Sequence, residues 1–266
     1  MSYQTIRAEK REKGIVWIIV NNPPVNAIGE QLMEELESAA EELTGDRSVR
    51  VVVITSAHPT IFLAGADLKG MISGGGSNLG EDENPIARQS ARMQACFNRF
   101  ATMPKPVIAS INGHALGGGC ELAMACDFRI MGKKGRIGLT ELSLGLIPGA
   151  GGTQRMTRLL GRSKALELIL LAKQLEAEEA LEIGLVHQAV PPDQLEAVTT
   201  AFAETLAEGA IHSMELAKRS INAAEAPLEV GLEVEAKAFA DTFLTEEPGI
   251  GLAAFFQKEK PKFLDD

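Results

Sequence analysis

Strand patterns alternate with helix patterns over the first part of the chain, and only helix patterns follow. Apolar, β-branched runs at residues 14–20 and 49–55 are typical of buried strands, whereas apolar residues recur with helical spacing at residues 30–43. This order predicts an α/β fold with a β/α core at residues 1–191 and a helical region at residues 192–266.

Two carboxylates lie beside glycines within residues 105–154. Glu121 follows a glycine triplet at 117–119, and Glu141 precedes a second glycine cluster at 149–152. Glycine lets backbone approach a ligand closely, so each carboxylate is expected beside accessible amides. Together these groups suit one kind of chemistry, in which the amides hold a developing oxyanion while the acids move protons.

Gly118 and Glu121 fall in the first turn of a helix predicted to run through Ala125. The N–H groups of a first turn have no partner within the helix, so the Gly118 amide can hold an anionic oxygen. Taken alone, Glu121 has another interpretation, because an acidic residue in the first turn stabilises its own helix. Glu141, taken alone, is equally consistent with an ordinary surface carboxylate.

Two earlier segments are rich in small residues. Residues 62–69 let backbone approach a ligand, with Asp67 able to cap the next turn, but a plain strand-to-helix turn would look the same. Residues 73–83, with Gly74 to Gly76 at their centre, are interpreted either as a tolerated surface insertion or as a lid over substrate.

Several enzyme classes lack their sequence signature. Neither a Gly-x-Ser-x-Gly motif nor a phosphate-binding P-loop occurs, and the loop at 149–154 has Gln154 where a dinucleotide motif requires glycine. The four histidines are far apart in the sequence, and none has a metal-ligand spacing. We therefore interpret the histidines as structural or surface groups.

Charge and cysteine content exclude other partners. The chain has 26 Lys and Arg against 36 Asp and Glu, a formal net charge of −10, which disfavours nucleic acid and anionic membranes as partners. Three cysteines without ligand-like spacing indicate buried, reduced thiols. With no apolar segment typical of a signal peptide or a membrane span, a cytoplasmic protein is expected.

The ordered set of motifs resembles the enoyl-CoA hydratase/isomerase (crotonase) family over nearly the whole chain. The matching segments, in chain order, are residues 22–27, 64–69, 105–109 and 112–123, Cys126 with Asp127, Glu141, residues 145–155, Ala180 with residues 184–186, and residues 255–258. Each segment is modest on its own, whereas the order of all of them is specific.

The resemblance implies a spiral of ββα units with a helical C-terminal region that packs trimers, which usually pair into hexamers. It implies that Ala66 and Gly118 supply the two amides that hold a thioester oxyanion. It also implies that Glu121 holds and activates a water molecule and that Glu141 protonates C2 of the substrate. The resemblance implies no metal and no redox cofactor, and coenzyme A enters only as part of the substrate.

The resemblance also implies contacts to the coenzyme A portion of the substrate. Val25 and Ala27 would line the pantetheine path, and Lys258 would reach coenzyme A from a neighbouring subunit. The residues expected near the adenine and the phosphates are Ala64, Asp67, Leu68 and Lys69. Lys258 also has a simpler interpretation, as one of several lysines on an exposed tail.

Because both carboxylates are kept, the expected activity is hydration of a trans-2-enoyl-CoA to a 3-hydroxyacyl-CoA in fatty acid β-oxidation. The main alternatives on the same scaffold are double-bond isomerisation and hydration of a branched or carboxylated enoyl-CoA. The acyl pocket decides between them, with Met71, Ile72, Leu142 and Leu144 as candidate walls. A non-catalytic, RNA-binding relative is disfavoured by the acidic net charge.

Overall fold

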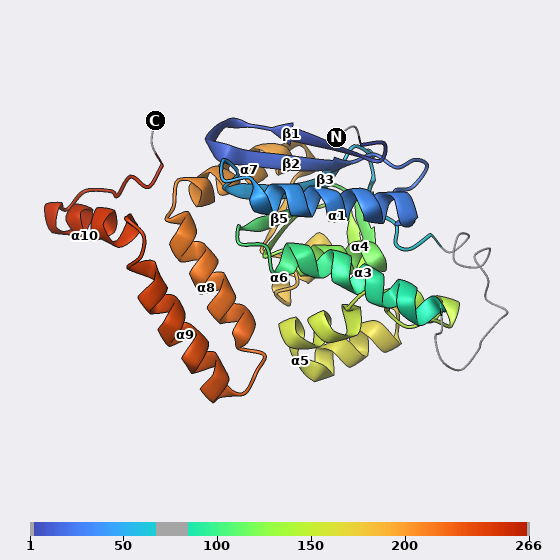
Figure 1. Cartoon of the computed structure of the whole chain (residues 1–266). Helices are drawn as coiled ribbons and strands as arrows, with labels where there is room; N and C mark the ends of the chain where they lie inside the picture. Colours follow the sequence, from blue (N-terminus) through green and yellow to red (C-terminus); the bar gives the residue numbers. More distant parts are fainter. Residues whose placement is uncertain (1–2, 68–84, 265–266) are drawn as a thin grey trace.

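The computed structural model describes residues 3–67 and 85–264, so Leu68, Lys69, Met71, Ile72 and the glycine-rich segment at 73–83 lie outside the described residues (Figure 1). The strands are β1 (Ile6–Lys10), β2 (Ile15–Val20), β3 (Val51–Ser56), β4 (Ile61–Leu63), β5 (Val107–Ile111), β6 (His114–Leu116), β7 (Phe128–Gly132), β8 (Arg136–Gly138), β9 (Leu175–Glu176) and β10 (Gln188–Val190). The α-helices are α1 (Glu30–Gly45), α3 (Pro85–Ala101), α4 (Gly118–Ala125), α5 (Gly152–Leu170), α6 (Ala177–Glu182), α7 (Leu195–Ala207), α8 (Ile211–Ala223), α9 (Leu228–Thr242) and α10 (Glu247–Gln257). Short 3-10 helices are η1 (Glu12–Gly14), η2 (Glu141–Leu144) and η3 (Pro192–Gln194).

The strands form two sheets that the chain visits alternately. The larger sheet has the order β1-β2-β3-β5-β7-β10 and is parallel except for the β1–β2 pair. The smaller sheet has the order β4-β6-β8-β9 and is parallel except for the β8–β9 pair. Three times the chain passes from the larger sheet to the smaller one and then into a helix, in β3-β4-α3, β5-β6-α4 and β7-β8-α5. The predicted spiral of ββα units is thereby confirmed.

The continuous apolar strands are buried on both faces of the larger sheet. Alternate side chains of a strand point to opposite faces, so Val52 and Ile54 join the main core whereas Val51 and Val53 belong to a second cluster. Helix α7 covers that second cluster with Leu195, Ala203 and Ala207. This double burial explains why β3 contains no alternation of polar and apolar residues.

The helical C-terminal region has two parts. Helix α7 packs on the larger sheet, while α8, α9 and α10 extend to one side of the sheets (Figure 1). The division between residues 1–191 and 192–266 stays a prediction, and α7 packs as part of the core. Within the described residues, no helix is long and apolar enough to cross a membrane.

Glu35 joins the N-terminal strand to α1. Its carboxylate accepts hydrogen bonds of 2.7–3.2 Å from the backbone N–H groups of Gln4, Thr5 and Ile6 and from the Thr5 hydroxyl. Burial disfavours the ionised form, but the donors outweigh it and lower the pKa of Glu35 to about 2. The ionised carboxylate therefore stabilises the folded chain.

We expect Glu35→Ala to lower the free energy of unfolding at pH 7 by roughly 2–4 kcal/mol, because several donors to a charged group lose their acceptor. The folded pKa is below the ordinary value of 4.5, so this stabilisation is present above pH 4.5 and fades as the pH falls toward 2. Urea unfolding across that range measures it. Glu34→Ala, on the exposed side of the same helix, is the matched control. An equal difference from wild type at pH 7 and pH 3 would contradict the assignment.

Candidate active site

A cavity of about 990 Å³ lies beside α3, the start of α4 and the start of α5. This volume is at the upper end of the usual range for small-molecule sites. Its lining includes Ala64, Ala66, Gly118, Glu121 and Glu141. The structure thus brings both candidate carboxylates and both candidate amide donors to one cavity, from three separate segments of the chain.

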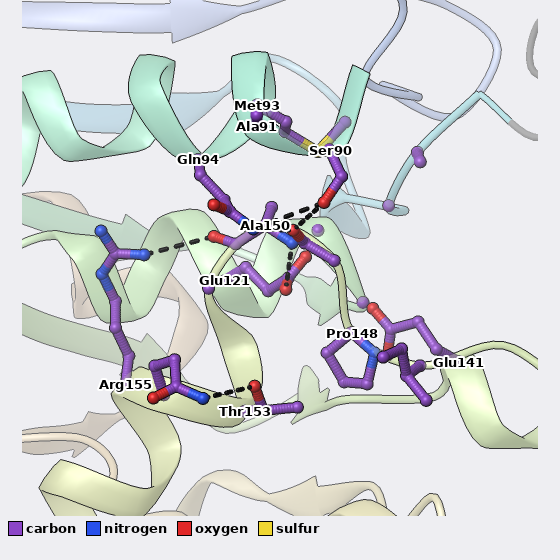
Figure 2. A pocket seen from close by; sticks show the side chains of 18 of the residues that line it. Ser90, Ala91, Met93, Gln94, Glu121, Glu141, Pro148, Ala150, Thr153 and Arg155 are labelled. Atoms are coloured by element: carbon purple, nitrogen blue, oxygen red, sulfur yellow. Dashed lines mark hydrogen bonds between the residues drawn. The ribbon is translucent and has the colours of Figure 1, made fainter. Parts of the chain in front are cut away.

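Glu121 lies in the first turn of α4 and is only 2% exposed. Its Oε1 atom accepts hydrogen bonds from the backbone N–H groups of Ala150 and Gly152, each at 2.8 Å (Figure 2). Both of these hydrogen bonds use Oε1, so Oε2 is the oxygen available to the cavity. Because both donors are backbone N–H groups, no change of side-chain rotamer can remove them, and they hold the carboxylate in one orientation.

The glycines are paired with the carboxylates in the opposite way to the expected one. A Cβ atom on Gly152, from the second cluster, would meet Oε1 of Glu121 at 2.8 Å. A Cβ atom on Gly117, from the first cluster, would meet Oε1 of Glu141 at 3.0 Å, and the φ of +53° at Gly117 also favours glycine. Each carboxylate therefore packs against the glycines that flank the other carboxylate in the sequence.

Glu141 begins the 3-10 helix η2 and is half-buried. Its Oε2 atom is buried, and no described group donates a hydrogen bond to it. Burial raises the pKa of Glu141. A buried carboxyl oxygen without a donor favours the protonated form of the group.

Burial also raises the pKa of Glu121, to about 7, and repulsion from Glu141 adds to the shift. The two amide hydrogen bonds and the positive charge of Arg155 act in the other direction. Two coupled carboxyls with raised pKa values can hold one proton between them near neutral pH.

The Ala66 and Gly118 amides lie close to each other at one edge of the cavity. A Cβ on Gly65 would be 3.5 Å from the Gly118 nitrogen, and a Cβ on Gly118 would be 3.5 Å from the Ala66 nitrogen. The bridge between Ile28 and Ala66 uses the Gly65 carbonyl and the Asp67 N–H, so it does not use the Ala66 N–H. The Gly118 N–H is in a first turn and has no partner within its helix. The two amides can therefore act together on one oxygen atom.

Buried Asn26 holds the segment before α1 beside these amides. Its side-chain amide donates to the Phe62 carbonyl at 3.1 Å and to the Ser56 hydroxyl at 2.7 Å. Its side-chain carbonyl accepts from the Asn22 N–H at 2.7 Å. These contacts fix the path of residues 22–28 next to the strand that leads to Ala66.

Other predicted residues lie outside the cavity lining. Val25, Ala27 and Asp67 belong to the neighbouring segments but do not line it. Lys258 directly follows α10, a helix that lies well away from α3 and α5, and it does not line the cavity (Figure 1). Its predicted contact therefore requires another subunit. Of the candidate acyl walls, Leu144 lines the cavity whereas Leu142 packs against the core.

Sequence reasoning missed several lining residues. Ser90 and Gln94 of α3 contact the loop at 149–152, and Leu146 and Ile147 form an exposed apolar part of the cavity wall. Leu146 and Ile147 follow Glu141 closely in the sequence, and this proximity could have predicted that they line the same cavity. The α3 residues are more than 50 positions from the loop, and no local pattern connects them. In the described part of the chain, no group of three His, Cys, Asp or Glu residues is arranged to hold a metal ion.

Comparison with known proteins is consistent across sequence and structure. The sequence model of the family described as Enoyl-CoA hydratase/isomerase matches residues 10–266. A probable enoyl-CoA hydratase of Mycobacterium tuberculosis is 38% identical over 266 residues, which are 99% of each chain. A short-chain-enoyl-CoA hydratase of Clostridium acetobutylicum is 36% identical over 98% of this chain and 97% of its own. The crystal structure of an enoyl-CoA hydratase from Bacillus anthracis superposes with a TM-score of 0.89 at 37% identity, covering 98% of this chain and 99% of the other.

Proposed function

The chain belongs to the enoyl-CoA hydratase/isomerase family, and from this premise we propose that it is an enoyl-CoA hydratase that converts a trans-2-enoyl-CoA to the 3-hydroxyacyl-CoA. The observation that carries the proposal is the meeting of Glu121 and Glu141 in one cavity with the amides of Ala66 and Gly118. A hydration needs both a base for water and an acid for carbon, and this cavity has two carboxyls with raised pKa values.

The amides of Ala66 and Gly118 would hold the thioester oxygen. When the water oxygen bonds to C3, the electron pair of the C2=C3 bond moves toward the thioester, and negative charge develops on its oxygen. A preorganised N–H donor at such an oxygen contributes about 3–4 kcal/mol to the transition state. The close approach of the two nitrogens in this chain supports a shared oxyanion site.

The two glutamates would move the protons. Burial and the charge of Glu141 raise the pKa of Glu121 to about 7, while its two N–H donors lower it and keep the ionised form accessible near neutral pH. We therefore assign Glu121 as the base that removes a proton from the attacking water. Glu141 has a buried oxygen without a donor among the described residues, so we assign it as the acid that protonates C2. The water's hydroxyl ends on C3 and a proton ends on C2, and the pair returns to its starting state by passing one proton from Glu121 to Glu141.

The coenzyme A portion would lie along the segments that flank the oxyanion site. We propose that Val25 and Ala27 border the pantetheine and that Ala64, Asp67, Leu68 and Lys69 lie toward the adenine and phosphates. Asn26 supports this arrangement, because it fixes the first of these segments beside the strand leading to Ala66.

We further propose a homotrimer or a dimer of trimers, in which Lys258 reaches the coenzyme A bound by a neighbouring subunit. Support comes from large apolar side chains on α9 and α10 and the turn between them that are more than half exposed in the single chain: Leu228, Leu232, Phe239, Phe243, Leu244, Leu252, Phe255 and Phe256. Exposed apolar surface of this extent is typical of protein contacts. A cytoplasmic location and a role in fatty acid β-oxidation complete the proposal.

The direct test is the loss of ultraviolet absorbance when the conjugated thioester of crotonyl-CoA is hydrated, repeated with longer trans-2-enoyl-CoAs. We expect rapid loss with crotonyl-CoA and a ranking of chain lengths, with product confirmed as 3-hydroxyacyl-CoA by mass. Saturated butyryl-CoA, which has no double bond, is the control for binding. If the CoA esters bind but none is hydrated, then isomerisation or hydration of a branched or carboxylated substrate replaces this proposal.

A further inference from the structure

Helix α3 holds the loop that carries the Glu121 donors. The Ser90 hydroxyl and the Gln94 side-chain amide both donate to the carbonyl oxygen of Gly149, at 2.7 and 2.8 Å (Figure 2). The two residues are four positions apart on one helix and so lie on the same face. A single backbone carbonyl thus receives two side-chain hydrogen bonds from one element.

The Gly149 carbonyl belongs to the same peptide unit as the Ala150 N–H, which donates to Glu121. A peptide unit is planar, so donors that fix the direction of the carbonyl also fix the direction of the N–H on its other side. Hydrogen bonds at the carbonyl also polarise the unit and strengthen what its N–H donates. The contacts therefore form a chain from α3, through one peptide unit, to Glu121 Oε1.

We propose that Ser90 and Gln94 are positioning residues for the reaction, which orient and polarise the Gly149–Ala150 peptide unit so that its N–H holds Glu121 in the orientation needed to take a proton from water. The inference rests on the proposed hydratase function for its kinetic consequences. It adds two residues of α3 to a site whose other polar groups come from α4, η2, the loop at 149–152 and the Ala66 amide.

The neighbouring contact made by Arg155 differs in kind. Its guanidinium donates to the Ala150 carbonyl at 3.2 Å, and that carbonyl shares its peptide unit with the Gly151 N–H. Glu121 accepts from Ala150 and Gly152, so the guanidinium does not act through either of those peptide units. The backbone N–H of Arg155 donates to the Gly151 carbonyl at 2.8 Å as part of the first turn of α5, and a side-chain substitution at Arg155 would leave that bond in place. Its effect on Glu121 is that of a nearby positive charge, opposed by the negative charge of Glu141. Among the side chains that the structure describes, Ser90 and Gln94 are the two that donate to the carbonyl of a peptide unit whose N–H donates to the carboxylate.

The test compares Ser90→Ala, Gln94→Met and the double variant with wild type in crotonyl-CoA hydration over a range of pH. We expect the double variant to lose kcat by roughly 10-fold or more with a small change in KM, because a weakened donor misplaces the base. The weaker donor also stabilises the ionised form less, so the acidic limb of the kcat/KM profile moves to higher pH by about half a unit to one unit. Ser90→Thr keeps the hydroxyl and should behave like wild type. Ala87→Ser, at an exposed position of the same helix outside the cavity lining, should leave the limb in place.

A readout independent of turnover separates this inference from the hydratase proposal. The carboxyl infrared band that disappears in Glu121→Gln reports the titration of Glu121 without substrate, and its midpoint should rise in the double variant. If wild type hydrates no enoyl-CoA but the midpoint rises, the hydratase proposal fails and the positioning role stands. If the midpoint and the kinetic limb stay at their wild-type values, or if activity falls only in step with a lower melting temperature, the two residues are a structural tie and the inference is overturned.

Discussion

Glu141→Gln is expected to reduce kcat by roughly 10²–10⁴-fold while leaving KM for crotonyl-CoA within a few-fold of wild type. The carboxamide has nearly the shape of the carboxyl group, so the cavity and the close contact with Gly117 are kept. What is lost is an acidic proton at the position where C2 of the substrate would lie. Steady-state kinetics give kcat and KM, and calorimetric titration with butyryl-CoA checks that binding survives.

Glu121→Gln is expected to show a loss of similar size for the opposite reason. The amide oxygen can still accept from the N–H groups of Ala150 and Gly152, so the loop is held, but an amide has no basicity toward water. The two single losses should not multiply in the double variant, because base and acid act together in the same hydration reaction. A single variant that keeps a turnover within three-fold of wild type removes that glutamate from the mechanism.

Stability provides the control against misfolding. The folded-state pKa of Glu121 is raised from 4.5 to about 7, so the folded chain binds a proton more tightly than the unfolded chain. The free-energy cost of ionising this buried group lowers the stability of the folded chain as the pH rises from 4.5 toward 7, and this loss is complete above pH 7. At pH 8, Glu121→Gln should therefore be as stable as wild type or more stable, with a free energy of unfolding higher by up to ~3 kcal/mol, while activity is lost. Denaturant unfolding measures this difference. An inactive variant that is also much less stable at pH 8 would indicate damage to the fold instead.

The strands and helices that the sequence predicted well are those with a sustained pattern. The continuous apolar run of β3 and the helical spacing in α1 are long enough for periodicity to decide, and their burial follows from it. Strands β4, β6 and β8 have three residues each, too few for any period, and they became clear only through their pairing in the smaller sheet.

The candidate site was predicted in part for the same physical reason. Placing Gly118 and Glu121 in one helical turn needs only local geometry, and α4 begins as expected. The partners of Glu121 lie about 30 residues further on, in a loop whose approach depends on how α5 packs on α4. Ser90 and Gln94 reach that loop from α3, across a separation of more than 50 residues, so local propensity contains no trace of the contact.

Replacing Gly118 with proline is expected to lower kcat by about 10²–10³-fold relative to Gly118→Ala, because proline lacks the N–H that would hold the thioester oxyanion. Position 118 suits this comparison. It is the first residue of α4, where the helix makes no use of the N–H and where proline is commonly accommodated. Gly117, which precedes it, already lies outside the right-handed helical region that proline disfavours in its neighbour.

Gly118→Ala is the matched control for this variant. It keeps the N–H and adds the same Cβ atom, which meets the end of the Ile28 side chain at 3.0 Å and requires that flexible group to move by a few tenths of an ångström. The steric cost of the Cβ atom is therefore shared. The difference in kcat between the two variants reports the loss of the N–H together with the ring carbon Cδ that replaces its hydrogen. Matching circular dichroism spectra and melting temperatures establish that both fold. If the proline variant turns over at a rate within a few-fold of the alanine variant, the oxyanion is held by donors other than the Gly118 amide, and Ala66 would have to act with a different partner.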